Sequence, residues 1–137
     1  MNLTRLFAEH CKILLEDVSA TATNGNKKMA KRFAAVGKAI IALYASVYGM
    51  SFDEADDYLY IVAYGSGDDI VKKLKEVKLC SPDQIFRKFS DCIKKHSAKS
   101  KYSVDIATEV AIIYAEWKRL SFGKALNMLC AQLEKAN

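Results

Sequence analysis

The sequence predicts an all-α domain, and three observations support this fold class. Apolar residues recur at intervals of three and four residues along nearly the whole chain, which is the spacing of one helix face. The breaks between these periodic segments carry residues that start or stop helices. The 137 residues include one proline and six glycines, so few positions interrupt a helix. We therefore expect a single-domain bundle of about seven helices over residues 1–137.

The first two helices are predicted over residues 3–20 and 27–48, with a loop rich in Thr, Asn and Gly between them. One face of the first helix carries Leu3, Phe7, Cys11, Leu14 and Val18. The second helix pairs a stripe of large apolar residues with many alanines, which permit close contact with neighbouring helices. That stripe consists of Met29, Phe33, Val36, Ile40, Leu43 and Val47. We expect the second helix to lie at the centre of the bundle.

A third helix is predicted from Ser51 to Tyr64, after a stop at Gly49. Ser51 and Glu54 have the spacing of a capping box, in which each side chain accepts a hydrogen bond from the other residue's backbone. Segment 58–64 is rich in strand-forming residues, but a lone strand would leave its backbone groups without partners. We therefore predict a helix there. Its inward face is expected to carry Phe52, Ala55, Leu59 and Val62.

Four further helices complete the prediction. A short fourth helix opens at Asp68, and a fifth begins with Ser81 as the cap and Pro82 at the first helical position. The sixth helix is expected to begin after a cap at Ser103, and the seventh after Ser121.

Residues 44–59 and 114–129 resemble each other at an offset of 70. The shared residues are Tyr44, Ala45, Ser51, Phe52, Ala55 and Leu59, which match Tyr114, Ala115, Ser121, Phe122, Ala125 and Leu129. One interpretation is two related three-helix halves, residues 1–65 and 81–137, joined by the short fourth helix. The other is that a helix, a tight turn and a capped start is a common local solution. The offset does not extend into the first helix of each half.

The sequence predicts no enzyme, no cofactor and no metal site. It contains only two histidines, His10 and His96, and none of the nucleophile-elbow, metalloprotease or phosphate-loop motifs. A zinc site formed by His96, Cys92, Cys80 and Cys11 is conceivable from helical spacing alone. Paired short spacings are absent, however, and a free cysteine is ordinarily a small buried apolar residue. We therefore expect no zinc.

Composition favours a cytoplasmic protein without a membrane segment. The N-terminal residues lack an apolar export stretch, and the four cysteines do not form a CxxC pair. The longest uncharged run, residues 39–52, has 14 residues, whereas a helix needs about 20 to cross a bilayer.

Positive charge suggests an acidic partner. The net charge is +5 and the isoelectric point is about 9.0. Two groups of cations could contact the phosphates of a nucleic acid without reading its bases: Lys27, Lys28, Lys31 and Arg32 in the first, and Lys94, Lys95, Lys99 and Lys101 in the second. The alternative is that each group is simply the solvated face of its helix.

Exposed tyrosines suggest a protein partner instead. Tyr60 and Tyr64 lie one helical turn apart and off the inward stripe of the third helix. Tyrosine is a favoured interface residue, and the adjacent acids Asp53, Asp56 and Asp57 could meet a basic surface. The alternative is that this helix is apolar nearly all round because it is enclosed within the domain. We expect a non-enzymatic protein that docks on a larger cytosolic protein or ribonucleoprotein complex as a small subunit, adaptor or inhibitor. The alternative function is sequence-nonspecific nucleic-acid binding.

Overall fold

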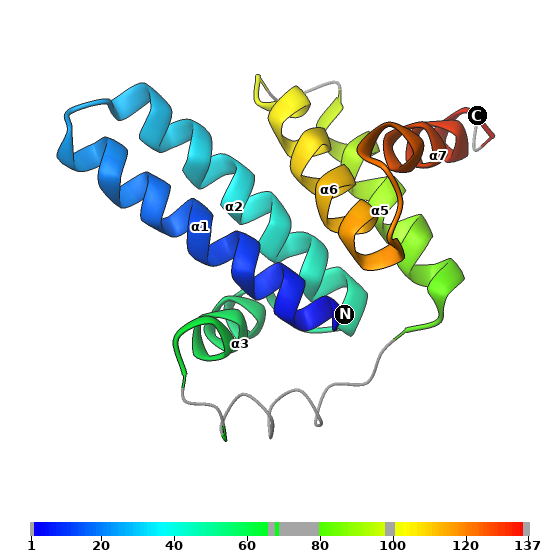
Figure 1. Ribbon diagram of the computed structural model, residues 1–137, viewed down its shortest axis with the longest axis horizontal. Helices are drawn as coiled ribbons and strands as arrows, with labels where there is room; N and C mark the ends of the chain where they lie inside the picture. Colours follow the sequence, from blue (N-terminus) through cyan, green and yellow to red (C-terminus); the bar gives the residue numbers. More distant parts are fainter. Residues whose placement is uncertain (1, 66–67, 69–79, 98–100, 136–137) are drawn as a thin grey trace.

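The computed structural model describes residues 2–65, 68, 80–97 and 101–135, and these residues form one all-helical domain (Figure 1). No strand occurs among them, so the predicted fold class is confirmed. Six helices are present in the described part: α1 (Leu3–Thr23), α2 (Lys27–Tyr48), α3 (Phe52–Tyr64), α5 (Pro82–Ser97), α6 (Ser103–Lys118) and α7 (Phe122–Lys135). The sequence predicts about seven; residues 69–79, where most of the fourth helix is predicted, lie outside the described residues.

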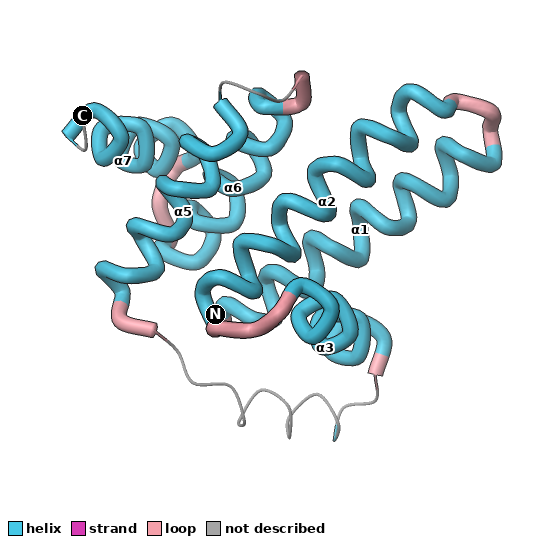
Figure 2. The backbone as a smooth tube through the Cα atoms, turned by 180° about the vertical axis from the view of Figure 1, so that it is seen from behind, coloured by secondary structure: helices cyan, strands magenta, loops and turns pink. Residues whose placement is uncertain are grey.

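The first three helices form a hairpin with a third helix across it. α1 and α2 lie side by side and are joined by a short turn, and α3 turns through 102° relative to α2 (Figure 2). Gly49 makes this change of direction possible, because its φ of 67° lies in the left-handed region that glycine adopts without a steric penalty. The predicted capping box is confirmed. The Glu54 N–H donates to Ser51 Oγ over 3.2 Å, and the Ser51 N–H donates to the Glu54 carboxylate over 3.3 Å.

The last three helices repeat this arrangement, with α7 across the pair formed by α5 and α6. Of the two helix caps predicted for α5 and α6, one is confirmed and one is wrong. The cap of α5 is confirmed, because Ser81 and Gln84 exchange backbone-to-side-chain hydrogen bonds of 3.3 Å each. The predicted cap of α6 at Ser103 is wrong. Ser103 is already helical, and Tyr102 stands at the cap position without a side-chain hydrogen bond to the helix. Once Ser103 has helical backbone angles, its hydroxyl is no longer placed to accept from the third helical residue.

Residues at the 70-residue offset have the same local geometry. Gly49 and Arg119 both adopt the left-handed conformation at a helix end. Ser51 Oγ and Ser121 Oγ each accept from the backbone N–H three residues later, at 3.2 Å. The paired residues Ala55 and Ala125, and Leu59 and Leu129, are all buried. Shared ancestry of the two halves stays a hypothesis, but the likeness extends beyond the capped turn into the packing.

Aromatic contacts in the core relate α1, the first helix of the first half, to α5, the first helix of the second half. The ring of Phe7 packs edge-on against Tyr44 at 5.3 Å, and the ring of Phe89 packs edge-on against Tyr114 at 5.5 Å. Phe7 and Phe89 therefore occupy matching places, at an offset of 82 rather than 70. Their rings also contact each other, with centroids 5.8 Å apart. One continuous core thus joins the two halves.

The helix α2 is central, as predicted. It packs against α1, α3, α5 and α6. Among the described residues no single helix is long and apolar enough to cross a membrane; only α2 and α3 taken together, across their 102° bend, reach that length and composition. A core helix buried within a folded domain has the same composition, and α2 buries seven residues along its length.

Candidate protein-docking groove

An apolar groove opens where α3 crosses the α1–α2 hairpin. It has a volume of about 280 Å³. Its walls come from all three helices of the first half, and its principal apolar residues are Leu14, Leu15, Val18, Phe33, Ile41, Leu59, Tyr60 and Tyr64. Three charged residues also line it: Lys12, Lys38 and Asp56. We refer to this site as the docking groove.

The groove lies on a hairpin that is longer than its counterpart in the second half, although the helix that crosses it is not. α1 and α2 have 21 and 22 residues, whereas the matching helices α5 and α6 have 16 each. The crossing helices α3 and α7 have similar lengths, 13 and 14 residues. The longer hairpin extends beyond α3 toward its turn, as seen from behind in Figure 2. Apolar residues there are left without a covering helix, and Leu15 is 49% exposed.

The two tyrosines lie where the sequence predicts, on the outward side of α3. Tyr60 is 58% exposed and Tyr64 is 44% exposed, and their ring centroids lie 4.9 Å apart. Nζ of Lys12 lies 5.1 Å from the centre of the Tyr64 ring, which is a cation–π distance. Both rings line the groove and remain partly exposed.

The expectation that Phe52 faces inward is wrong. Phe52 is 40% exposed and lies at the rim of the groove, whereas Ala55, Leu59 and Val62 are buried as predicted. Phe52 is the first residue of α3. The helical pattern continues back to this position, but the burying surface does not.

The predicted acidic residues are exposed at the start of α3. Asp53, Asp56 and Asp57 are on the surface, and Asp56 also lines the groove. Within the described ranges, no group of three or more His, Cys, Asp or Glu side chains is arranged so that it could hold a metal ion. Burial raises the pKa of the Cys11 thiol to about 12 and that of Cys92 to about 11. Both thiols are therefore protonated at neutral pH and poor nucleophiles.

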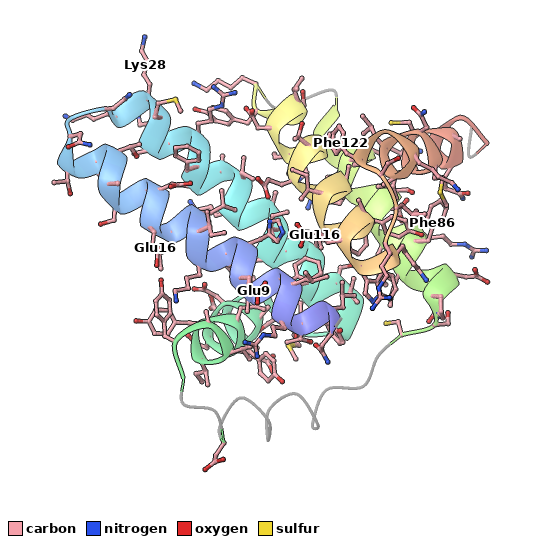
Figure 3. The ribbon with its side chains drawn as sticks, in the orientation of Figure 1. Glu9, Glu16, Lys28, Phe86, Glu116 and Phe122 are labelled. Atoms are coloured by element: carbon pink, nitrogen blue, oxygen red, sulfur yellow. The ribbon has the colours of Figure 1, made fainter. Side chains whose placement is uncertain are left out.

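The helix ends that carry the predicted basic residues lie at one end of the fold, and Arg32 and Lys101 contact other side chains there. The turn between α1 and α2, the end of α5 and the start of α6 lie at the same edge of the molecule (Figure 1), and Lys28 projects outward there (Figure 3). The Arg32 guanidinium, however, faces Asp105 on α6, with two hydrogen bonds of 2.8 and 2.6 Å. Nζ of Lys101 lies 5.1 Å from the centre of the Tyr102 ring. Lys99 falls outside the described residues.

Three exposed lysines near the α1–α2 turn have no such engagement. Lys27, Lys28 and Lys31 form no ion pair with another described residue. They stand at the start of α2, which contains no acidic residue from Lys27 to Tyr48. On the second helix pair, Lys94 and Lys95 are exposed near the end of α5.

The polar contacts between the halves were not predicted from the sequence. Arg32 pairs with Asp105 across 73 positions, and His10 pairs with Glu109 across 99 positions. No local spacing signals such pairs, because they depend on how α6 lies against α1 and α2. The docking groove was also missed, since it results from the difference in length between helices far apart in the chain.

No protein-family model, curated protein sequence or solved structure matches the chain. The lining of the groove combines apolar walls, two partly exposed tyrosine rings and charged residues of both signs.

Proposed function

We propose that this protein is a non-enzymatic docking protein that attaches to a larger cytosolic complex as a small subunit, adaptor or inhibitor. The observation that supports the proposal is the docking groove, an apolar depression edged by the exposed rings of Tyr60 and Tyr64. Exposed apolar clusters rimmed by charge are typical of protein interaction sites.

The energetics favour a protein partner for this surface. Burying a large apolar side chain completely is worth about 1.5–3 kcal/mol. Leu15, Tyr60 and Tyr64 each retain a large part of that surface for a partner. Tyrosines also immobilise at low entropic cost, because they have few rotatable bonds. Asp53, Asp56 and Asp57 beside them add charge that selects among partners more than it adds affinity.

The test is recovery of a partner from the native cytosol by the tagged protein, with matched variants. We expect one reproducible partner to be lost from the double variant Tyr60→Ala/Tyr64→Ala. The control is Phe122→Ala, because Phe122 matches Phe52 at the 70-residue offset and is 42% exposed, yet lies on α7 away from the groove. Equal recovery by the tyrosine variant and the control, or no specific partner at all, would overturn the proposal.

The second candidate function is binding to nucleic-acid phosphates, and one observation favours it. The start of α2 and the end of α5, which carry described residues of the two predicted basic groups, lie at a common edge of the fold, and Lys27, Lys28 and Lys31 form no ion pair with another described residue. Such binding falls steeply with salt, because each phosphate contact releases a counterion. Binding to mixed single- and double-stranded DNA and RNA at low salt, lost on adding salt, would support this function. No binding at low salt would remove it.

A further inference from the structure

We infer that the docking groove accepts one amphipathic helix of the partner, with its apolar side against α1 and α2 and with carboxylates toward the lysines of α2. This inference rests on the proposed function and names the chemistry of the partner. It draws on two independent observations: the uncovered length of the first hairpin, and the separation of charge between its walls.

The uncovered length matches the width of a helix. α1 and α2 exceed α5 and α6 by five and six residues, which at about 1.5 Å per residue is about 8–9 Å. Neighbouring helices pack with their axes about 8–10 Å apart. A partner helix can therefore lie beside α3 on the same hairpin, where the second half has no spare length.

The apolar floor suits a helix rather than an extended peptide. Leu14, Leu15 and Val18 come from one helix, and Phe33, Gly37 and Ile41 come from the other, so ridges of both are presented to the groove. Gly37 adds no side chain to the floor of the groove. An extended strand would need free backbone partners along the groove, and the backbones of α1 and α2 are engaged within their own helices.

Charge on the α2 side favours carboxylates on the partner helix. α2 carries Lys27, Lys28, Lys31, Arg32 and Lys38 and no acidic residue. Lys38 lines the groove, and Lys31 lies two turns before it on the same helix face. Neither lysine forms an ion pair with another described residue. α3, with four acids and no base, occupies the other wall and would repel carboxylates placed on its side.

The experiment uses a synthetic probe and ¹⁵N-labelled full-length protein. The probe is a hydrocarbon-stapled peptide of about 16 residues, with leucine on one face and glutamate elsewhere; the staple is needed because short helices are marginal in water. We expect it to shift the amide resonances of groove residues such as Leu15, Gly37 and Tyr64. A probe with lysine in place of glutamate should bind about five- to tenfold more weakly.

Matched charge variants test the role of the α2 lysines. Lys31→Glu/Lys38→Glu should weaken binding of the glutamate probe about five- to tenfold. Arg87→Glu/Lys124→Glu makes the same change in charge at exposed positions of the second half and should leave binding unchanged. No resonance shift at millimolar probe, shifts confined to other surfaces, or equal affinity for the glutamate and lysine probes would each overturn the inference.

The outcomes also separate this inference from the proposed function. A native partner whose recovery depends on Tyr60 and Tyr64, without binding of the glutamate probe, would retain the docking function and overturn the helical acidic ligand. Binding of the probe at the groove, without any tyrosine-dependent native partner, would support the helical acidic ligand and overturn the docking function.

Discussion

Nδ1 of His10 lies 3.0 Å from Oε2 of Glu109, across the contact between α1 and α6. Nε2 of the same ring lies 3.3 Å from Oε1 of Glu116, which Figure 3 shows on the side of α6 that faces α1. Burial acts to lower the pKa of His10, but the hydrogen bonds and charges of the two carboxylates outweigh it, and the pKa is raised above its ordinary value. Protonation of His10 therefore strengthens the contact between the two halves of the domain.

This contact predicts a stability that depends on pH. Because the folded-state pKa of His10 is raised, its contribution is fully present below about pH 6.5, its unfolded value, and is lost as the pH rises through the folded value. His10→Gln should lower the free energy of unfolding by about 1 kcal/mol at pH 6 and by less at pH 9. Urea denaturation at both pH values measures the difference.

The other histidine provides the control. The pKa of His96 is lowered, first by burial and then by Lys95, so protonation opposes folding there. Its contribution to stability therefore changes with pH in the opposite direction. His96→Gln should not reproduce the loss at pH 6. An equal loss at pH 6 and pH 9 in the His10 variant would show that the carboxylate contacts do not act through charge.

The two left-handed helix ends predict substitutions of opposite effect. Gly49 and Arg119 have φ values of 67° and 57°, a region that costs a residue with a side chain about 1–2 kcal/mol. Gly49→Ala should therefore destabilise the domain by about 1 kcal/mol, and Arg119→Gly should stabilise it by about 0.5–1 kcal/mol. Chemical denaturation of both variants is the measurement. Effects of the same sign would contradict the matching geometry of the two turns.

The helices could be predicted from the sequence because the contacts that begin and end them are local. Ser51 with Glu54 and Ser81 with Gln84 begin helices through contacts three residues apart, and both caps are found as predicted. The burial of Ala55 and Leu59 and the exposure of Tyr60 and Tyr64 follow from the helical period and are also confirmed. Each of these features is decided within one or two turns of chain.

What sequence reasoning missed depends on how the helices meet. Phe52 belongs to the apolar pattern of α3 but is 40% exposed and lines the groove, whereas Ala55, Leu59 and Val62 are buried. Arg32 belongs to a basic run but is drawn to Asp105 by the position of α6. The groove depends on the relative lengths of two hairpins, which no motif encodes.

Two buried hydroxyls predict a contrast in the core. Ser90 is buried, and its hydroxyl has no hydrogen-bond partner among the described residues. Thr4 is equally buried, but its hydroxyl lies 3.2 Å from that of Tyr44 and 3.3 Å from that of Tyr48. An unpaired buried hydroxyl costs about 1–3 kcal/mol, so Ser90→Ala should be neutral or stabilising by up to about 1 kcal/mol.

The matched substitution is Thr4→Val, which keeps the shape and removes the hydroxyl. It should destabilise the domain by about 1–2 kcal/mol, because the hydroxyls of Tyr44 and Tyr48 lose a partner in a buried place. Thermal unfolding of both variants gives the comparison. A larger loss for Ser90→Ala than for Thr4→Val would mean that the Ser90 hydroxyl is satisfied.

The contact between Phe7 and Phe89 predicts that the halves unfold together. Trp117, the single tryptophan, lies on α6 and reports on the second half, whereas far-ultraviolet circular dichroism reports on all helices. Because both rings belong to one core, Phe7→Leu should lower the midpoint of the tryptophan transition although Phe7 is in the first half. Phe7→Leu and Phe89→Leu should each lower the free energy of unfolding by about 1 kcal/mol. The double variant Phe7→Leu/Phe89→Leu should reveal a coupling of about 0.5–1.5 kcal/mol between the two rings. A tryptophan transition unmoved by Phe7→Leu, with the circular dichroism transition shifted, would instead indicate two separately folding halves.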